Sequence, residues 1–459
     1  MKIRPSLAAI GLMSMALVAG GLSPIADAAP AAPAVAAAAV SAPTTQPDRI
    51  TLNPTADSQT TQTVTWRTST EVTGAQLQFS PDTANPWGFK STTVGANTQV
   101  IGSDLGYQQA FHSATITGLK PATTYLYRVG GAGKWSAWMP FTTSNPSARK
   151  TSLIAMGDIQ TGIRDHWTRV AAAAAADRPN AKALITVGDQ INTFNNDDQW
   201  HQLFEAAGII PQRMIWIPAV GNHEYRSTDS GELTPQFRAQ FELPLNGPTE
   251  FEHFKETVYY TDVDNVRVIT MNSYYRIPLE PADEQRWLDA QAIWLENVLK
   301  NNPREFTVVN MHCPLYSSSP DRGNPQLRAT IGPILEKYSV DLVLQGHDHA
   351  YVSGQKDVDK DAKRKGPNRA NGPIYVTSSS SNRQYPLRYT DWTKNGATPK
   401  TAFHSRSTYQ LIDVEGKKMV YTAKDSTGLV VDQWVVEHKG KQHQKTVRHV
   451  TGIGVAPSS

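Results

Sequence analysis

The segment ALITVGDQIN, Ala183–Asn192, decides the fold class. It opens with an apolar run, as expected of a strand buried on both faces, and then turns polar at Gly188 and Asp189. The same order, an apolar run closed by a polar signature, recurs along the chain from about residue 150 onward. The runs are TSLIAMGD, ALITVGDQ, MIWIPAVGN, VRVITMNS, FTVVNMH, VDLVLQGH and PIYVTSS.

Several segments between these runs have the apolar spacing of helices. The clearest is DEQRWLDAQAIWLENVLK, for which we predict one apolar face. Strands that alternate with helices indicate an α/β domain with mainly parallel strand pairing, here over residues 147–400. The predicted face of that helix consists of Trp287, Leu288, Ile293, Leu295 and Leu299.

Five of the runs end in short polar signatures that hold metal-ligand residue types. Successive signatures at Asp158, Asp189 and Asn222 lie about 30 residues apart, which is the length of one strand–helix–strand unit. Ligand sites in such folds form outside the carboxyl ends of the strands, so these side chains should converge. A glycine before the Asp, Asn or first His should let the backbone turn sharply there. The signatures are GDIQTG (157–162), GDQIN (188–192), GNHEY (221–225), VNMHCP (309–314) and GHDHAY (346–351), and the converging residues are Asp158, Asp189, Asn222, His312, His347 and His349.

The residue types in these signatures point to transition-metal chemistry. Carboxylate, amide oxygen and imidazole suit Mn²⁺, Fe²⁺, Zn²⁺ or Co²⁺, and one carboxylate can bridge two ions. Two ions about 3.5–4 Å apart bind a phosphoryl group and lower the pKa of a shared water until it is a nucleophile. The sequence therefore predicts a two-metal hydrolase of phosphate esters.

Residues 48–146 have a different pattern, with short alternating strands around Val64, Trp66 and Tyr127. Period-two alternation at this spacing favours a small β-sandwich. The run LKPATTY, Leu119–Tyr125, resembles the tyrosine corner of fibronectin type III-like domains. No metal-ligand cluster occurs in this part of the sequence, so we interpret it as a packing or docking module.

The ends of the chain have their own signatures. Residues 1–28 are typical of a cleaved secretory signal peptide, with Lys2 and Arg4 before an apolar core, and residues 29–47 of an Ala/Pro-rich linker. An exported protein with no stable membrane span is therefore expected. Strand-like alternation returns in residues 401–440, which should add a β-layer to the catalytic domain, and residues 441–459 should form a loose polar tail.

The order GD, GD, GNHE, VxxH, GHxH resembles that of the calcineurin-like metallophosphoesterases, in their purple acid phosphatase branch. The resemblance covers about Arg49 to Lys439. It implies an α/β (α+β) four-layer metallophosphoesterase sandwich preceded by an all-β fibronectin type III-like sandwich. It also implies that Asp189 bridges two metals, that Asp158 and His349 bind the first, and that Asn222, His312 and His347 bind the second. His223 would steady the phosphate and protonate the leaving oxygen, and Glu224 would orient His223 or a ligand.

Two positions depart from the family pattern. The tyrosine that binds ferric iron in purple acid phosphatases is replaced by Asn192, and the histidine found in the wider superfamily is replaced by Gln160. The first metal is one familiar ligand short, and Gln160 and Asn192 are the two candidates to replace it. A ferric–tyrosinate centre is not expected, and two divalent ions (Mn, Fe, Zn or a mixture) are.

Composition limits the partners. The 459 residues are 19% charged with a net charge of only +3, which gives no support for a polyanion-binding surface, so no nucleic acid binding is expected. We predict a secreted phosphomonoesterase with a metal-bridging hydroxide and a small phosphorylated substrate. One alternative is a phosphodiesterase of nucleotides or phospholipid head groups; another is a metal-dead extracellular binding protein. Arg322, Arg328 and Arg383 are expected at the surface, and Cys313, the single cysteine, in the interior.

Overall fold

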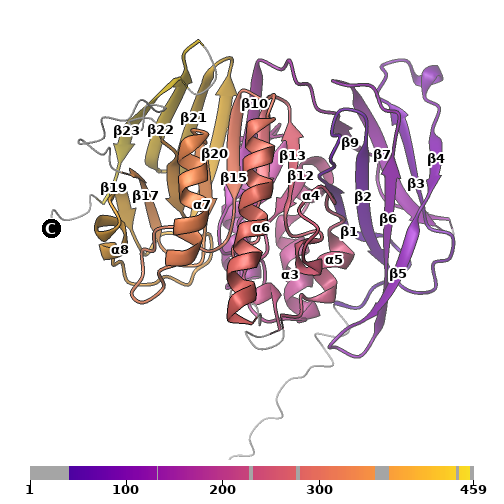
Figure 1. Cartoon of the computed structure of the whole chain (residues 1–459). Helices are drawn as coiled ribbons and strands as arrows, with labels where there is room; N and C mark the ends of the chain where they lie inside the picture. Colours follow the sequence, from indigo (N-terminus) through magenta and orange to yellow (C-terminus); the bar gives the residue numbers. More distant parts are fainter. Residues whose placement is uncertain are drawn as a thin grey trace, which may run out of the picture.

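A computed structural model describes residues 41–131, 133–226, 231–274, 280–356, 372–440 and 444–454. The predicted signal peptide and most of the predicted linker lie outside these residues. Figure 1 shows two parts side by side, an all-β part at the amino-terminal end and a larger part built from sheets and helices. Among the described residues, no helix is both long and apolar enough to cross a bilayer.

The amino-terminal part is a β-sandwich, as predicted. Its core contains Trp66, Val64 and Tyr127, each fully buried, and the core residues of one strand lie two positions apart. The Tyr125 hydroxyl accepts a hydrogen bond from the Lys120 backbone N–H (3.0 Å), which is the expected tyrosine corner. One sheet consists of β1 (Asp48–Asn53), β2 (Gln62–Thr68), β6 (Gln108–Ile116) and β5 (Asn97–Gly102), and the other of β4 (Thr92–Gly95), β3 (Gln76–Pro81), β7 (Thr124–Gly131), β8 (Lys134–Trp135) and β9 (Met139–Thr142).

The second part contains two seven-stranded sheets with helices on their outer faces, and one continuous apolar core joins them. In Figure 1, α6 and α7 stand side by side in front of the sheet that holds β15. The first sheet runs β12 (Ile215–Pro218), β11 (Ala183–Thr186), β10 (Lys150–Met156), β20 (Thr408–Glu415), β21 (Lys418–Asp425), β22 (Val430–His438) and β23 (Lys445–Gly452). The second runs β13 (Tyr259–Val263), β14 (Val266–Thr270), β15 (Phe306–Asn310), β16 (Leu342–Gln345), β18 (Ile374–Thr377), β17 (Tyr351–Lys356) and β19 (Ala397–Phe403). The α-helices are α2 (Thr168–Asp177), α3 (Asp197–Ala207), α4 (Ile210–Arg213), α5 (Pro235–Gln240), α6 (Pro281–Lys300), α7 (Pro325–Lys337) and α8 (Thr390–Lys394), and the shorter turns are η1 (Pro86–Gly88), η2 (Ile163–Trp167), η3 (Asn222–Glu224) and η4 (Glu252–Phe254).

All the apolar runs from residue 150 onward form strands, and the α/β architecture is confirmed. Parallel pairing holds for β10–β11–β12 and for β14–β15–β16–β18. The remaining strands pair antiparallel at the flanks, so the expectation of mainly parallel pairing applies only to these two central groups. The C-terminal strands follow one another as hairpins, which can only pair antiparallel.

The predicted apolar face of α6 is wrong at one position. Trp287, Leu288 and Leu295 are buried, whereas Ile293 is 71% exposed. A helix advances about 100° per residue, so position 293 falls on the side opposite to these three. Gln291 lies on the buried side instead and donates a hydrogen bond to the Asn272 carbonyl (3.0 Å).

The expected loose tail is also wrong over most of the described part. Lys445–Gly452 forms β23, an edge strand that pairs antiparallel with β22. Lys445 is 3% exposed, and its Nζ donates to the carbonyls of Ser339 (2.7 Å) and Val340 (2.9 Å) and pairs with Asp341 Oδ1 (2.9 Å). The polar composition suggested a solvated segment, but here a buried ammonium finds a complete set of acceptors.

Candidate metal centre

The six converging residues follow strands of both sheets. Asp158, Asp189 and Asn222 come after β10, β11 and β12 of the first sheet, and the histidines come after β15 and β16 of the second. The structure brings all of them together where the two sheets meet. Two groups of possible ligands, Asp158–Asp189–His349 and Asp189–His312–His347, each have their donor atoms within 4.8 Å of one another. Asp189 belongs to both groups.

The group around His312 is the more compact one. Its Nε2 lies 3.1 Å from Asn222 Oδ1, 3.1 Å from His347 Nδ1 and 3.3 Å from Asp189 Oδ2. Ligand atoms at about 2.1 Å from one ion lie about 3.0–3.5 Å apart in octahedral or tetrahedral arrangements. His312 Nδ1 bonds the Val187 carbonyl (3.0 Å), which leaves Nε2 for a metal.

The group around His349 includes one of the two candidate replacement ligands. Gln160 is buried, and its Oε1 lies 3.2 Å from His349 Nε2, a separation like that between Asn222 and His312. The Gln160 amide donates to Asn192 Oδ1 (3.2 Å), which turns the Gln160 carbonyl oxygen toward His349. The Asn192 side chain is thus engaged by Gln160. His349 Nε2 is 3.9 Å from Asp158 Oδ1, and His349 Nδ1 bonds the Arg383 carbonyl (3.2 Å).

His223 stands next to the shared carboxylate. Its backbone N–H donates to Asp189 Oδ1 (3.0 Å), and its ring Nδ1 donates to the carbonyl of Asn192. The carbonyl can only accept, so Nδ1 carries a hydrogen and Nε2 is the nitrogen left for a ligand. Asn192 therefore contacts both Gln160, by its side chain, and His223, by its backbone.

Glu224 is fully buried and orients a ligand rather than His223. Its carboxylate accepts hydrogen bonds from the backbone N–H groups of Asp189 (2.9 Å), Gln190 (2.8 Å) and Gly221 (2.7 Å). These bonds tie the turn after β11 to the turn after β12. The resemblance left open whether Glu224 orients His223 or a ligand. The contacts favour the orientation of a ligand.

Four of the candidate ligands have the left-handed backbone that non-glycine residues rarely adopt. Their φ angles are 34° at Asp158, 51° at Asp189, 71° at His347 and 46° at His349. Such strain persists only where the surroundings enforce it, and it concentrates at functional sites. The sharp turn is thus made mostly by the ligands themselves.

The expected reason for the neighbouring glycines is therefore correct only in part. Gly188 has a φ of 99°, as expected of a glycine that turns the chain. At the other positions space is the reason: a Cβ would lie 2.1 Å from Ser378 O at Gly157, 2.1 Å from Asp189 Oδ1 at Gly221 and 2.6 Å from Asp158 Oδ2 at Gly346. A side chain there would displace a candidate ligand or its support.

Burial and mutual repulsion shift the protonation of the centre. Burial and the neighbouring Asp189 carboxylate raise the pKa of Asp158 to about 8. Burial lowers the pKa of His312, but Asp189 and Asp158 outweigh it and raise the pKa to about 9. Burial lowers the pKa of His349 to about 4 and raises that of Glu224 to about 7. The metal-free centre therefore holds protons on Asp158 and His312 near neutral pH, and a bound cation would displace them.

Residues not expected from the sequence support the histidine turn after β16. Asp348, between the two histidines, is fully buried and accepts hydrogen bonds from the Ser318 backbone (2.6 Å) and the Ser317 hydroxyl (2.8 Å). Arg322 pairs with Asp348 (3.2 Å) and donates to the His347 carbonyl (2.8 Å). The only sequence signal was an acidic residue inside the GHDH signature.

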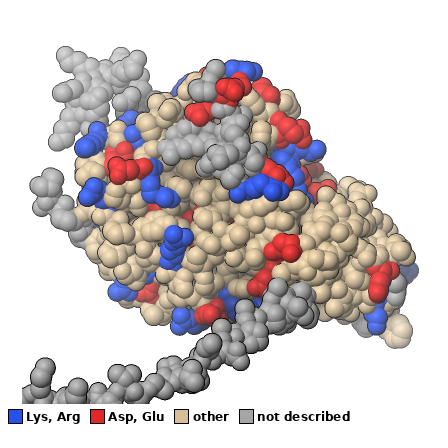
Figure 2. Space-filling view, turned by 90° about the horizontal axis from the view of Figure 1, so that it is seen from below, with Lys and Arg blue, Asp and Glu red and all other residues tan. Residues whose placement is uncertain are grey.

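The arginines and the cysteine that the sequence singled out have different surroundings. The Arg322 side chain is 32% exposed but fixed to the histidine turn, so the surface interpretation is wrong for its role. Arg328 pairs with Asp391 (3.0 Å). Arg383 is exposed, and Cys313 is buried, as expected. Figure 2 shows acidic and basic side chains interspersed over the face seen from below.

Two family models match the chain. The first, described as "Purple acid Phosphatase, N-terminal domain", matches residues 47–143, and the second, "Calcineurin-like phosphoesterase", matches residues 151–351. Together they cover the β-sandwich and the strand ends that hold the candidate ligands.

The chain is similar to several curated proteins at low identity. An uncharacterized protein of Mycobacterium tuberculosis is 24% identical over 328 residues, which are 64% of this chain and 60% of that protein. Purple acid phosphatase 22 of Arabidopsis thaliana is 26% identical, over 58% of this chain and 57% of that protein. Acid phosphatase type 7 of Mus musculus is 24% identical, over 63% and 67%. The match thus spans less than two thirds of the length of the first two.

Solved structures share the fold. A purple acid phosphatase from seeds of yellow lupin (Lupinus luteus) has a TM-score of 0.69 and 17% identity, and the match covers 90% of this chain and 77% of that chain. The structure of PhoD has a TM-score of 0.62 and 10% identity, with 89% and 92% covered. At these identities the likeness concerns the fold alone.

Proposed function

Because the chain belongs to the calcineurin-like phosphoesterases that carry a purple acid phosphatase N-terminal domain, we propose that it is a metal-dependent hydrolase of phosphate monoesters. The observation that carries the proposal is that Asp189 belongs to both groups of candidate ligands. One carboxylate with two oxygens could hold two ions, and His223, whose backbone N–H bonds Asp189 Oδ1, would then lie beside them.

The donor set fits two divalent ions. Asp158, His349 and the bridging Asp189 would hold the first, and Asn222, His312 and His347, with Asp189, the second. We assign the missing ligand of the first ion to Gln160, because its Oε1 lies 3.2 Å from His349 Nε2 while its amide group is held by Asn192. The set of oxygen and nitrogen donors suits Mn, Fe, Zn or a mixture, and it contains no phenolate for a ferric–tyrosinate centre.

Bound ions would supply the Lewis acidity that holds the phosphate oxygens and activates water. The protein's own contribution is made by His223 and Glu224. Because Nδ1 donates to the Asn192 carbonyl, Nε2 is the His223 nitrogen that would deliver a proton to the leaving oxygen. Glu224 fixes the backbone of Asp189, and with it the position of the shared carboxylate.

The substrate we propose is a small phosphate monoester, with a diester as the alternative. The signal-like residues 1–28 support export, and the intact mass of the secreted protein would locate the cleavage site.

The deciding experiment compares the mature exported protein with its Asp189→Ala variant. Metals are quantified by plasma mass spectrometry, and p-nitrophenyl phosphate and bis-p-nitrophenyl phosphate are assayed under Mn²⁺, Zn²⁺ and Fe²⁺. The expected result is about two metals per chain and turnover of the monoester, with both lost in Asp189→Ala. Asp289→Ala, on the exposed side of α6, is the matched control that should retain both. Absence of metal and of turnover in the parent protein would refute the proposal, and faster turnover of the diester would favour the alternative.

A further inference from the structure

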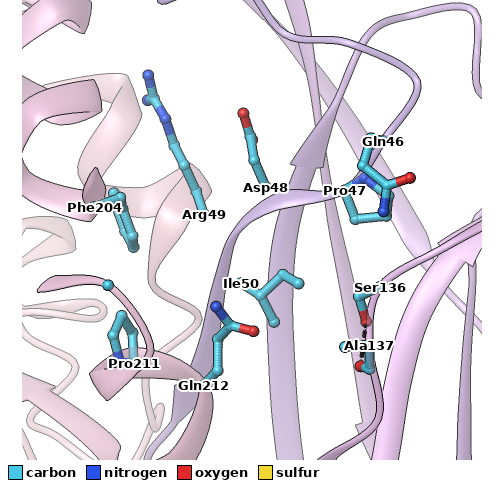
Figure 3. Close-up of a pocket in the computed structure, with 11 residues that line it drawn as sticks. Gln46, Pro47, Asp48, Arg49, Ile50, Ser136, Ala137, Phe204, Pro211 and Gln212 are labelled. Atoms are coloured by element: carbon cyan, nitrogen blue, oxygen red, sulfur yellow. Dashed lines mark hydrogen bonds between the residues drawn. The ribbon is translucent and has the colours of Figure 1, made fainter.

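Several buried polar contacts join the β-sandwich to the catalytic part. Each has its own apolar core, and Ile215 packs against both. Figure 3 shows Arg49 extending from β1 toward the helices of the catalytic part, beside a cavity of about 310 Å³ between the two parts. Apolar packing across the boundary is therefore incomplete there.

A single buried carboxylate collects donors of the sandwich at this boundary. Asp197, the first residue of α3, is fully buried, and Arg49 pairs with both of its oxygens (2.9 and 3.0 Å). We call Asp197 and its sandwich partners the Asp197 clamp. The other partners are Arg67 (3.3 Å), the Tyr107 hydroxyl (2.6 Å) and Gln109 Nε2 (3.2 Å).

The clamp lies at one end of a short loop whose other end is the shared ligand Asp189. Residues 190–196, which we call the Asn192 loop, join Asp189 to α3. Gln199, in the first turn of α3, accepts hydrogen bonds through Oε1 from the backbone N–H groups of Asn192 (2.8 Å) and Thr193 (2.9 Å). The position of α3 therefore sets the position of Asn192.

Asn192 in turn holds two residues of the centre. Its carbonyl accepts from His223 Nδ1, and its side chain accepts from Gln160 (3.2 Å). A continuous chain of contacts thus runs from the sandwich through Asp197, Gln199 and Asn192 to the candidate acid and the candidate first-metal ligand.

We propose that the β-sandwich positions the metal centre through the Asp197 clamp, and that Asp197 and Gln199 are positioning residues. This assigns to the sandwich a role in setting the Asn192 loop rather than in binding a partner. The inference rests on the proposed function for its effect on metals, but the loop geometry can be measured without any metal.

Two tyrosines of the sandwich provide a matched test in the full-length protein. Tyr107→Phe removes the hydroxyl that donates to Asp197, and Tyr127→Phe removes one that donates to the Gln212 carbonyl (2.9 Å) outside the Asn192 loop. Gln199→Ala removes the acceptor that holds the loop. Asp197→Asn removes the charge itself, and if that variant does not fold, the other three variants still decide the question.

The first readout is amide hydrogen exchange of the metal-free protein. Exchange at Asn192 and Thr193 should be faster in Tyr107→Phe and Gln199→Ala than in Tyr127→Phe or the parent. The second readout is metal affinity by chelator competition, where the first two variants should lose about tenfold in the affinity of the weaker site and Tyr127→Phe less than twofold. Rescue of Gln199→Ala is expected in Gln199→Glu, which keeps an acceptor oxygen.

Equal exchange at Asn192 in both tyrosine variants would overturn the inference. If the parent protein bound no metal, the proposed function would fail, but the exchange data would still decide the role of the clamp. Faster exchange with unchanged metal affinity would overturn the link from the loop to the centre.

Discussion

In the Asp197 clamp a buried carboxylate faces two guanidinium groups, whereas in the metal centre Asp158 and Asp189 face each other. Burial alone would raise the pKa of both kinds of group. At Asp197 the neighbouring Arg49 and Arg67 outweigh burial and lower the pKa. At Asp158 burial, together with Asp189, outweighs the opposing effect of His312 and raises the pKa. The backbone differs as well, since the left-handed conformation occurs at Asp158 and Asp189 but not at Asp197. The comparison separates charge that stabilises the fold from charge that the fold holds for a ligand.

The largest expected effect is on activity, at Asp158. Asp158→Asn should reduce kcat/KM by at least about a thousandfold, or about 4 kcal/mol, because a proposed metal ligand loses its charge. The metal-free variant should nevertheless be at least as stable as the metal-free parent at pH 8, since the substitution removes repulsion with Asp189. Urea unfolding in the presence of a chelator measures this. A clear loss of stability would show that the charge of Asp158 stabilises the fold, as that of Asp197 does, and would contradict the comparison.

The clamp should respond in the opposite way. Asp197→Ala should lower the free energy of unfolding by about 3–5 kcal/mol, because two buried guanidinium groups lose a carboxylate. Chemical denaturation measures this loss with and without metal, and the size should be similar in both. A loss below about 1 kcal/mol would mean that Asp48, which also pairs with Arg67, compensates for the missing charge.

A smaller effect should appear in the pH dependence of the metal-free protein. Above about pH 6.5, where the histidines of the unfolded chain are already neutral, the raised pKa values of Asp158 (about 8), Glu224 (about 7) and His312 (about 9) mean that the folded state binds more protons than the unfolded chain, up to about pH 9. Its stability should therefore fall as the pH rises through this range. Bound metal keeps the carboxylates ionised and His312 neutral, so the metal-loaded protein should lose less. Melting temperatures from pH 7 to 9, with chelator and with metal, check this, and equal slopes would contradict it.

The smallest effect on stability is expected at an exposed ion pair. Lys150 and Glu415 form an ion pair with side chains that are 77% and 70% exposed. Lys150→Ala should change the free energy of unfolding by less than about 0.5 kcal/mol, because water screens the pair. Thermal unfolding at low and high salt measures it. A change comparable to that of Asp197→Ala would show that burial does not explain why the ion pairs of Asp197 stabilise the fold more than this exposed pair.

The strand ends were predictable because each carries its own local signature. An apolar run before Asp158, Asp189 or His312 identifies the strand and its candidate ligand together, and the order of the signatures resembles that of the family. The strands of the sandwich and its tyrosine corner were predictable for the same reason.

What the sequence did not reveal depends on contacts between distant segments. Asp197 pairs with Arg49, which is 148 residues away, and nothing near either residue indicates the other. The same holds for Lys445, whose acceptors lie about a hundred residues earlier. The local sequence also could not decide whether Gln160 or Asn192 is the better candidate for the missing ligand of the first metal. That choice depends on which amide faces His349.

The left-handed backbone at Asp158 and Asp189 also constrains how this scaffold can evolve. Asparagine and glycine reach that conformation at low cost, and β-branched residues do not. Exchanges that remove the charge are therefore the ones the main chain accepts most readily. A descendant could lose its metals by single steps and keep its shape, which gives the fold a short path from enzyme to binding protein.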